Sequence, residues 1–184
     1  DLPTNGTPFT SVVVDGNTVY LYGGAGINLR NDIFTSNVNL LSVIDTIGVF
    51  ITAGDWCFAS CISATTFNLP NLTSAGDFCF DSCTSVTIFN LPLLEAAGLS
   101  CFDSCTSVTT FNSPNLTSAG DFCFQSCNSV TIFNLPNIIT AGEGCFDSCT
   151  SVTIFNLPNI ITAGVNCFAS CISATAFNLP NIIT

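Results

Sequence analysis

A 22-residue repeat dominates this sequence. The stretch from Cys145 to Gly164 recurs in close variants six times, and no insertion or deletion interrupts the spacing across residues 53–184. The aromatic residue after the first cysteine of each unit marks the period: Phe58, Phe80, Phe102, Phe124, Phe146 and Phe168. A fixed period of about 20 to 50 residues is typical of arrays in which each unit buries its apolar face against its neighbours. The repeat therefore predicts a solenoid, whose functional groups lie in columns of side chains rather than in one pocket.

Each unit contains one clear strand signal. The segment Val152-Thr-Ile-Phe155-Asn-Leu157 has apolar residues at relative positions one, four and six, which is the strand spacing of leucine-rich repeats. A proline follows in every unit, and proline suits a strand end because it cannot donate to the ladder. Cys-Phe-x-Ser-Cys is expected to form one helical turn that buries both cysteines. We predict an α/β repeat solenoid of the leucine-rich-repeat type, right-handed, with a parallel β-sheet on one face and short turns or helical pieces on the other.

The residues before the array differ from it. Two β-branched or aromatic runs flank an Asp-Gly-Asn turn within residues 12–22, which predicts a β-hairpin. Residues 1–26 are therefore interpreted as a linker followed by a β-hairpin cap, residues 27–52 as a degenerate capping repeat, and residues 53–184 as six regular repeats. The sequence stops where every earlier unit continues into Ala-Gly, so we expect the C-terminal end of the array to lie beyond Thr184.

The repeated pattern Phe-x-x-Cys-x-Ser-Val-x-x-Phe-x-Leu-Pro-Asn resembles the BspA-like leucine-rich repeats of bacterial, protozoan and phage surface proteins. The resemblance covers residues 53–184 closely and 27–52 loosely, and residues 1–26 have no counterpart in it. Two features depart from the family pattern: a cysteine replaces the alanine before phenylalanine, and each unit is one residue shorter than the common length of the family's repeat. The resemblance implies surface display, adhesion or partner binding, and it brings no catalytic residue with it.

Charge is sparse and almost entirely negative. The chain has 12 Asp and Glu residues, one Lys or Arg and no His, for a net charge of −11. Nucleic acids and anionic membrane surfaces require many cations, so both are excluded as partners. No stretch approaches the 18 or more apolar residues of a membrane span, and none is predicted.

Twelve cysteines lie in the array, two per unit with three residues between them. A zinc site would need a second pair or histidines to close a tetrahedron, whereas these pairs line up as ladders. Stacked coils about 4.8 Å apart fall within the Cα range of disulfides, so bridges between coils remain an alternative. Free cysteine is among the most buried residue types and behaves as a small hydrophobe. Buried free thiols are the preferred interpretation, and both phenylalanine columns are interpreted as core.

The acidic residues fall into two columns that include the i, i+4 pairs Asp77/Asp81 and Glu143/Asp147. Like charges stacked in this way repel, and a calcium ion bound by their oxygens would relieve the repulsion. Several units carry Leu, Val, Gln or Ala at the same positions, so a solvated face that keeps the rod soluble is the preferred interpretation. No metal site or cofactor is predicted.

The best candidates for a binding face are polar residues that alternate with the buried positions of the strand. They are Asn68, Asn90, Asn112, Asn134, Asn156, Asn178, Thr87, Thr109, Thr131 and Thr153. A surface of asparagine and threonine side chains is able to hydrogen-bond a glycan, and equally able to form sheet ladders that bind nothing. The sequence leaves both interpretations open.

Catalysis has little chemistry available, because there is no histidine or lysine and identical units offer no unique site. We predict a non-enzymatic, surface-displayed recognition or adhesion module for a host or neighbouring-cell glycan or protein, located outside the cell or on the surface of a cell or virion. The alternative is a structural spacer, fibre or spike component of a phage virion or bacterial surface appendage. Flanking regions are possible sites of homo-oligomer formation. Saturable glycan binding that is lost on substitution of the asparagine column distinguishes the two.

Overall fold

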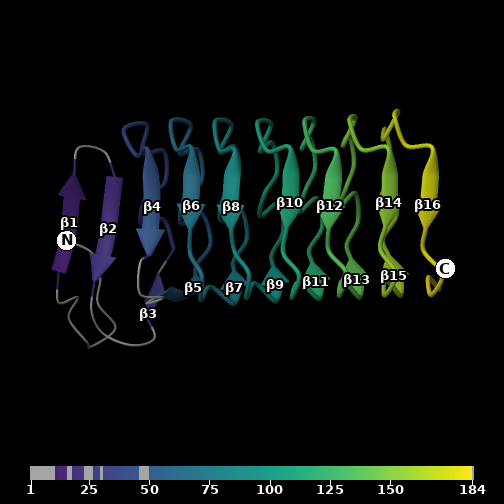
Figure 1. The fold of residues 1–184 in the computed structure, drawn as a ribbon, viewed down its shortest axis with the longest axis horizontal. Coiled ribbons are helices and arrows are strands. Elements are labelled where there is room, and N and C mark those ends of the chain that lie inside the picture. The colour runs from purple at the N-terminus through teal and green to yellow at the C-terminus, as the bar shows by residue number, and fades with distance from the viewer. Residues whose placement is uncertain (1–10, 16–17, 23–26, 30, 46–49, 184) are drawn as a thin grey trace.

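The computed structural model describes residues 11–15, 18–22, 27–29, 31–45 and 50–183. Its coils stack in a straight row along the long axis, and each regular coil contributes two short strands (Figure 1). Like residues lie over like residues in neighbouring coils. Phe67 pairs with Phe89 and Asn68 with Asn90 in a parallel register. The predicted solenoid is confirmed.

The strand predicted from the sequence forms the first strand row, the upper row of arrows in Figure 1. Its members are β4 (Ser42–Asp45), β6 (Thr66–Asn68), β8 (Ile88–Asn90), β10 (Thr110–Asn112), β12 (Ile132–Asn134), β14 (Ile154–Asn156) and β16 (Ala176–Asn178). In each regular coil, phenylalanine is the middle residue of the strand and its two neighbours point outward. The period of two along a strand therefore sets which residues are available to a partner.

The lower row of arrows in Figure 1 is a second strand row. It consists of β3 (Ile27–Leu29), β5 (Phe50–Ala53), β7 (Ser74–Ala75), β9 (Ala96–Ala97), β11 (Ser118–Ala119), β13 (Thr140–Ala141) and β15 (Thr162–Ala163), which form one continuous sheet. Backbones approach so closely after this row that a Cβ on Gly120 would lie 2.6 Å from the carbonyl carbon of Gly98. This contact explains why glycine follows this row in every regular unit.

A β-hairpin precedes the stack, as predicted. β1 (Ser11–Asp15) pairs antiparallel with β2 (Thr18–Tyr22), and Asp15 lies opposite Thr18. β2 then pairs in parallel with β4, which attaches the hairpin to the first strand row. The turn residues 16–17 and most of the predicted linker lie outside the described residues.

Two phenylalanine columns fill the core. Phe58, Phe80, Phe102, Phe124 and Phe146 are fully buried, and each ring stacks on the next at centroid separations of 5.2–5.5 Å. Rings of the strand column contact them edge-on, as Phe111 contacts Phe124 at 4.7 Å. Phe34 extends the first column into the capping repeat by stacking on Phe58 at 5.2 Å.

The described residues contain no helix, so the expected helical turn of Cys-Phe-x-Ser-Cys is not formed. Phe78 and Ser82 have φ values of 55° and 56°, and such left-handed residues interrupt a right-handed helix. The backbone instead forms hydrogen bonds between neighbouring coils. For example, the Phe80 N–H donates to the carbonyl of Cys101 at 2.8 Å. We call these segments, typified by residues 77–83, the turn row. Both cysteines of each regular pair nevertheless point inward, and all twelve cysteines are free thiols.

Candidate functional site

The structure places the predicted binding residues together on the outer side of the first strand row. Asn90, Asn112, Asn134, Asn156 and Asn178 are exposed and Asn68 is half-buried. The threonine column beside them is also exposed, from Thr87 to Thr109, Thr131 and Thr153. We call this surface the Asn/Thr face.

The asparagine side chains of the Asn/Thr face bond to one another in pairs. Asn90 Nδ2 donates to Asn68 Oδ1, and Asn134 Nδ2 donates to Asn112 Oδ1 at 2.6 Å. The third pair joins Asn178 Nδ2 to Asn156 Oδ1, also at 2.6 Å. No hydrogen bond joins the side-chain amides of Asn90 and Asn112, or those of Asn134 and Asn156, although all four residues are described. The column is therefore a set of pairs and not a continuous ladder.

The backbone of the first strand row is divided at the same two places. One sheet contains β1, β2, β4, β6 and β8 in that order. Beyond it, β10 pairs only with β12, and β14 pairs only with β16. Thr87 N–H donates to Thr65 O at 3.0 Å and Thr131 N–H to Thr109 O at 2.9 Å. The equivalent bond from Thr109 to Thr87 is not formed, and the threonine hydroxyls follow the same pattern.

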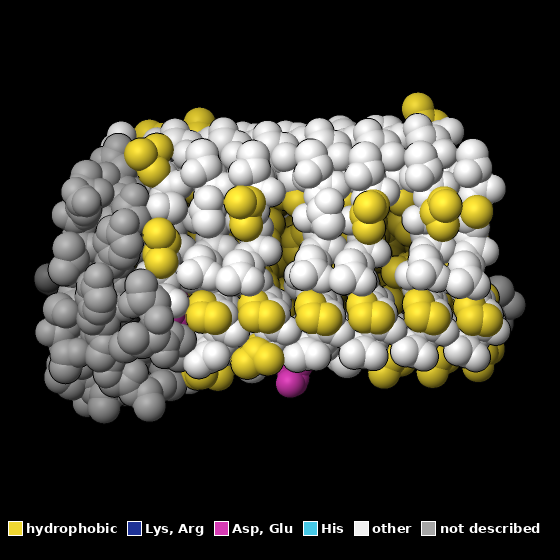
Figure 2. Space-filling model, in the orientation of Figure 1, with side chains coloured by type: hydrophobic (Ala, Val, Ile, Leu, Met, Phe, Trp, Pro, Cys, Tyr) yellow, Lys and Arg dark blue, Asp and Glu magenta, His cyan; other side chains and the backbone are white. Residues whose placement is uncertain are grey.

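Two openings result, which we call slot 1 (between β8 and β10) and slot 2 (between β12 and β14). Slot 1 lies in a hollow of about 720 Å³ and slot 2 in one of about 410 Å³. Figure 2 shows both as depressions with hydrophobic side chains at the floor. Six lining residues of slot 1 recur at the same repeat positions in slot 2: Thr87, Ile88, Phe89, Asn90, Thr109 and Asn112 correspond to Thr131, Ile132, Phe133, Asn134, Thr153 and Asn156.

The buried rings lie further apart than paired strands usually do. Ring centroids of the Phe58–Phe146 column are 5.2–5.5 Å apart in successive coils, and those of the strand column are 5.4–6.3 Å apart. Paired parallel strands prefer about 4.8 Å. Ring separation does not set where the row opens, because Phe80 and Phe102 at slot 1 are 5.2 Å apart whereas Phe102 and Phe124, in the coils of paired β10 and β12, are 5.5 Å apart. The second strand row also pairs continuously over the same coils.

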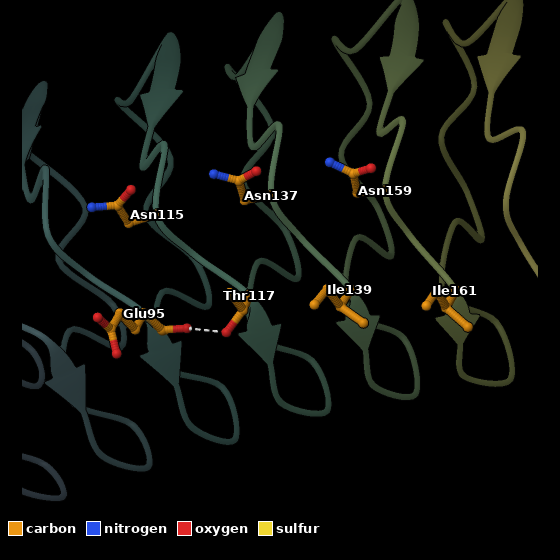
Figure 3. Close-up of a pocket in the computed structure, with 7 residues that line it drawn as sticks. All are labelled: Glu95, Asn115, Thr117, Asn137, Ile139, Asn159 and Ile161. Atoms are coloured by element: carbon orange, nitrogen blue, oxygen red, sulfur yellow. Dashed lines mark hydrogen bonds between the residues drawn. The ribbon is translucent and has the colours of Figure 1, made fainter.

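A shallower groove of about 560 Å³ runs beside the second strand row. Figure 3 shows its two columns: Asn115, Asn137 and Asn159 at one level, and Glu95, Thr117, Ile139 and Ile161 at another. The Asn137 and Asn159 amides donate to the proline carbonyl of the preceding coil, at 2.9 Å each. This asparagine column was not predicted as a binding surface, although asparagine follows five of the six repeat prolines.

The Asn/Thr face carries almost no charge. Figure 2 shows hardly any acidic side chains and no basic ones over the described strands. The acids lie mainly on the turn row, where Asp77 Oδ1 accepts from the backbone N–H of Leu99 at 2.8 Å. Asp55 and Asp121 accept from the next coil in the same way. These carboxylates therefore serve to join coils.

The second acidic column is half-buried. Desolvation raises the pKa of the Asp81 carboxyl, and repulsion from Asp103 raises it further. Desolvation also raises the pKa of Asp103, partly offset by bonds from Ser104. Asp147 accepts hydrogen bonds from Ser148 and from Gln125.

The structure does not gather the calcium candidates into one site. Asp77, Asp81, Glu143 and Asp147 belong to two separate coils, and no group of three or more acidic, cysteine or histidine side chains among the described residues is suited to a metal ion. The thiols are deeply buried, and desolvation raises the pKa of Cys127 to about 12. A thiol of this kind is a poor nucleophile and a poor metal ligand at neutral pH.

Comparison with protein-family models identifies the repeat. The model of the BspA type leucine-rich repeat region matches residues 27–112 and 93–184, with six copies. The chain belongs to this family. No curated protein sequence gives a significant match.

Solved structures with a similar fold include bacterial leucine-rich repeat proteins. A leucine-rich repeat protein of T. pallidum has 20% identity and a TM-score of 0.72, covering 86% of this chain and 78% of its own. A leucine-rich cell surface protein of Faecalibacterium prausnitzii also has 20% identity and a TM-score of 0.72, covering 98% and 56%. A leucine-rich repeat protein of Bacteroides ovatus has 20% identity and a TM-score of 0.55, covering 97% and 52%. This BspA-type chain spans little more than half of the last two proteins, and the likeness establishes the fold.

No helix that could cross a membrane occurs among the described residues.

Proposed function

We propose that this BspA-type chain is a non-catalytic recognition module, displayed outside the cell or on the surface of the cell or particle that carries it. Its binding surface is the Asn/Thr face, and its partner is a glycan or a protein of a host or neighbouring cell. The family and the cell-surface neighbour support a role in interaction.

One observation carries this proposal: exposed, hydrogen-bonding side chains form an uncharged surface across successive coils, and that surface is hollowed. Solenoids use such extended faces for recognition. The turn row is a poorer candidate because its carboxylates already bond between coils.

The test is saturable binding to glycan and protein arrays by the wild type and by a variant with Asn90, Asn134 and Asn156 replaced by tyrosine. We expect the variant to lose binding because its bulky rings cover the hollows. Asn128, an exposed residue of the turn row, provides the matched control, since Asn128→Tyr leaves the face intact. Equal binding by wild type and triple variant would contradict the proposal.

A structural spacer is the second candidate, and the straight, uniform stack in Figure 1 favours it. A spacer role predicts no saturable ligand and full function after removal of one 22-residue unit. A module that recognises its partner across several coils is expected to lose affinity after the same deletion.

A further inference from the structure

Each slot presents one free acceptor and one free donor on opposite walls. Asn90 uses Nδ2 to bond Asn68, and Asn112 uses Oδ1 to accept from Asn134. The two polar atoms of an amide point apart, so Asn90 Oδ1 and Asn112 Nδ2 are left toward slot 1.

Slot 2 repeats this arrangement two coils further along. Asn134 donates to Asn112 and Asn156 accepts from Asn178, which leaves Asn134 Oδ1 and Asn156 Nδ2 toward the opening. Thr109 in slot 1 and Thr153 in slot 2 add hydroxyls that donate no bond to the neighbouring coil, unlike those of Thr87 and Thr131.

An aromatic edge forms the floor of each slot. Phe89 and Phe133, on one wall of each slot, are 7% and 5% exposed, whereas Phe111 and Phe155, on the other wall, are 1% exposed. Phe89 and Phe133 also line the two hollows. Exposure, strand pairing and amide pairing therefore mark the same two places.

We propose, on the basis of the recognition role above, that the two slots bind hydroxyl groups of a neutral β-1,4-linked glycan that lies along the solenoid axis. A hydroxyl donates and accepts at once, so one sugar hydroxyl satisfies both Asn90 Oδ1 and Asn112 Nδ2. The apolar face of a pyranose ring suits the phenylalanine edge below. The slot walls carry no charged side chain, and the net charge of −11 disfavours an anionic glycan.

The spacing of the slots favours this linkage. They lie two coils apart, which is about 11 Å, since the ring centroids of these coils are separated by 5.2 Å (Phe80 to Phe102) and 5.5 Å (Phe102 to Phe124). Successive rings of an extended β-1,4-linked chain alternate in orientation, so the same edge recurs at every second sugar, at a similar distance. A glycan that reaches both slots binds the second one intramolecularly, which raises its overall affinity.

The experiment uses soluble β-1,4-linked oligomers of glucose, mannose and N-acetylglucosamine, measured by calorimetry with the whole chain. We expect one series to bind, with a rise in affinity of about tenfold or more once the oligomer is long enough to occupy both slots. Asn112→Asp with Asn156→Asp turns each slot-facing donor into an acceptor and leaves Oδ1 available to the paired amide. This double variant is expected to weaken binding about tenfold or more.

Asn37→Asp is the matched control, because the exposed Asn37 also accepts through Oδ1, from the Asn39 N–H, and lines neither hollow. We expect the control to change affinity by less than about twofold. Thermal melting checks that each variant folds. Thr109→Val with Thr153→Val supplies a second test that removes slot-facing hydroxyls without changing side-chain shape.

The outcomes separate this inference from the broader one. Loss of binding in both slot variants but not in Asn37→Asp supports the slots as hydroxyl sites. Equal loss in Asn112→Asp/Asn156→Asp and the control, or affinity that does not depend on oligomer length, overturns the slots and leaves recognition by the face intact. Binding to a protein but to no neutral glycan also overturns the inference alone, whereas no ligand of any kind overturns both.

Discussion

Replacing Phe124 by alanine tests whether the stacked rings hold the array together. Phe124 is fully buried in the middle of the stack. Its ring lies 5.5 Å from Phe102 and 5.4 Å from Phe146 along its own column. It also contacts Phe111 at 4.7 Å and Phe133 at 5.2 Å. One substitution therefore removes four aromatic contacts.

The expected loss of unfolding free energy is large. Phe-to-Ala substitutions in cores cost about 3–5 kcal/mol, and aromatic pairs add about 0.5–1.5 kcal/mol each beyond the buried area. We expect Phe124→Ala to lie at the top of that range, at about 5 kcal/mol. For a chain of this size the melting temperature should fall by about 10–20 °C.

Phe168→Ala is the matched control. Phe168 is half-buried in the last coil, and within its column it stacks only on Phe146, at 5.5 Å. We expect about half the cost of Phe124→Ala. Urea denaturation measures both variants. The central variant should also show a lower denaturant slope, because a weakened interface in a repeat array lets the two sides unfold separately. Equal losses in the two variants, or a loss below about 2 kcal/mol for Phe124→Ala, would refute a core held by ring stacking.

Three further predictions concern the turn row and the thiols. Asp77→Ala removes the acceptor for the Leu99 N–H and should lower the unfolding free energy by about 1 kcal/mol. Asp77→Asn keeps an acceptor oxygen, so its loss of unfolding free energy should be smaller. Thermal melts compare the two variants, and identical losses would contradict this role of Asp77. Burial raises the pKa of Cys171 from 9.0 to about 11, so we expect iodoacetamide at pH 8 to label native Cys171 slowly and the deeply buried Cys123 only after denaturation, as read by mass spectrometry. Because the folded thiols hold their protons to higher pH than the unfolded chain, stability should fall as pH rises from about 9 toward 11, and unchanged urea midpoints at pH 8 and pH 10 would contradict the burial of these thiols.

Much of the candidate site followed from side-chain periodicity. The alternation around Phe89 predicted that Thr87 and Asn90 flank a buried ring and face outward, and the structure places them there. The unbroken spacing of Cys79 and Phe80 likewise predicted buried columns. The turn row was not predictable in the same way, since a five-residue segment with two inward cysteines fits a helical turn as well as the left-handed conformations that Phe78 and other residues adopt.

The sequence alone determined that this chain is a solenoid, which residues are buried and which are exposed, because each depends only on a pattern within one unit. It also determined that the exposed strand face is rich in asparagine and threonine and poor in charge. The tertiary structure alone decided where that face opens. A 22-residue period treats every neighbouring pair of coils alike, whereas backbone pairing in the first strand row stops between β8 and β10 and again between β12 and β14. The positions of the slots are thus a property of the whole stack, and no single unit encodes them.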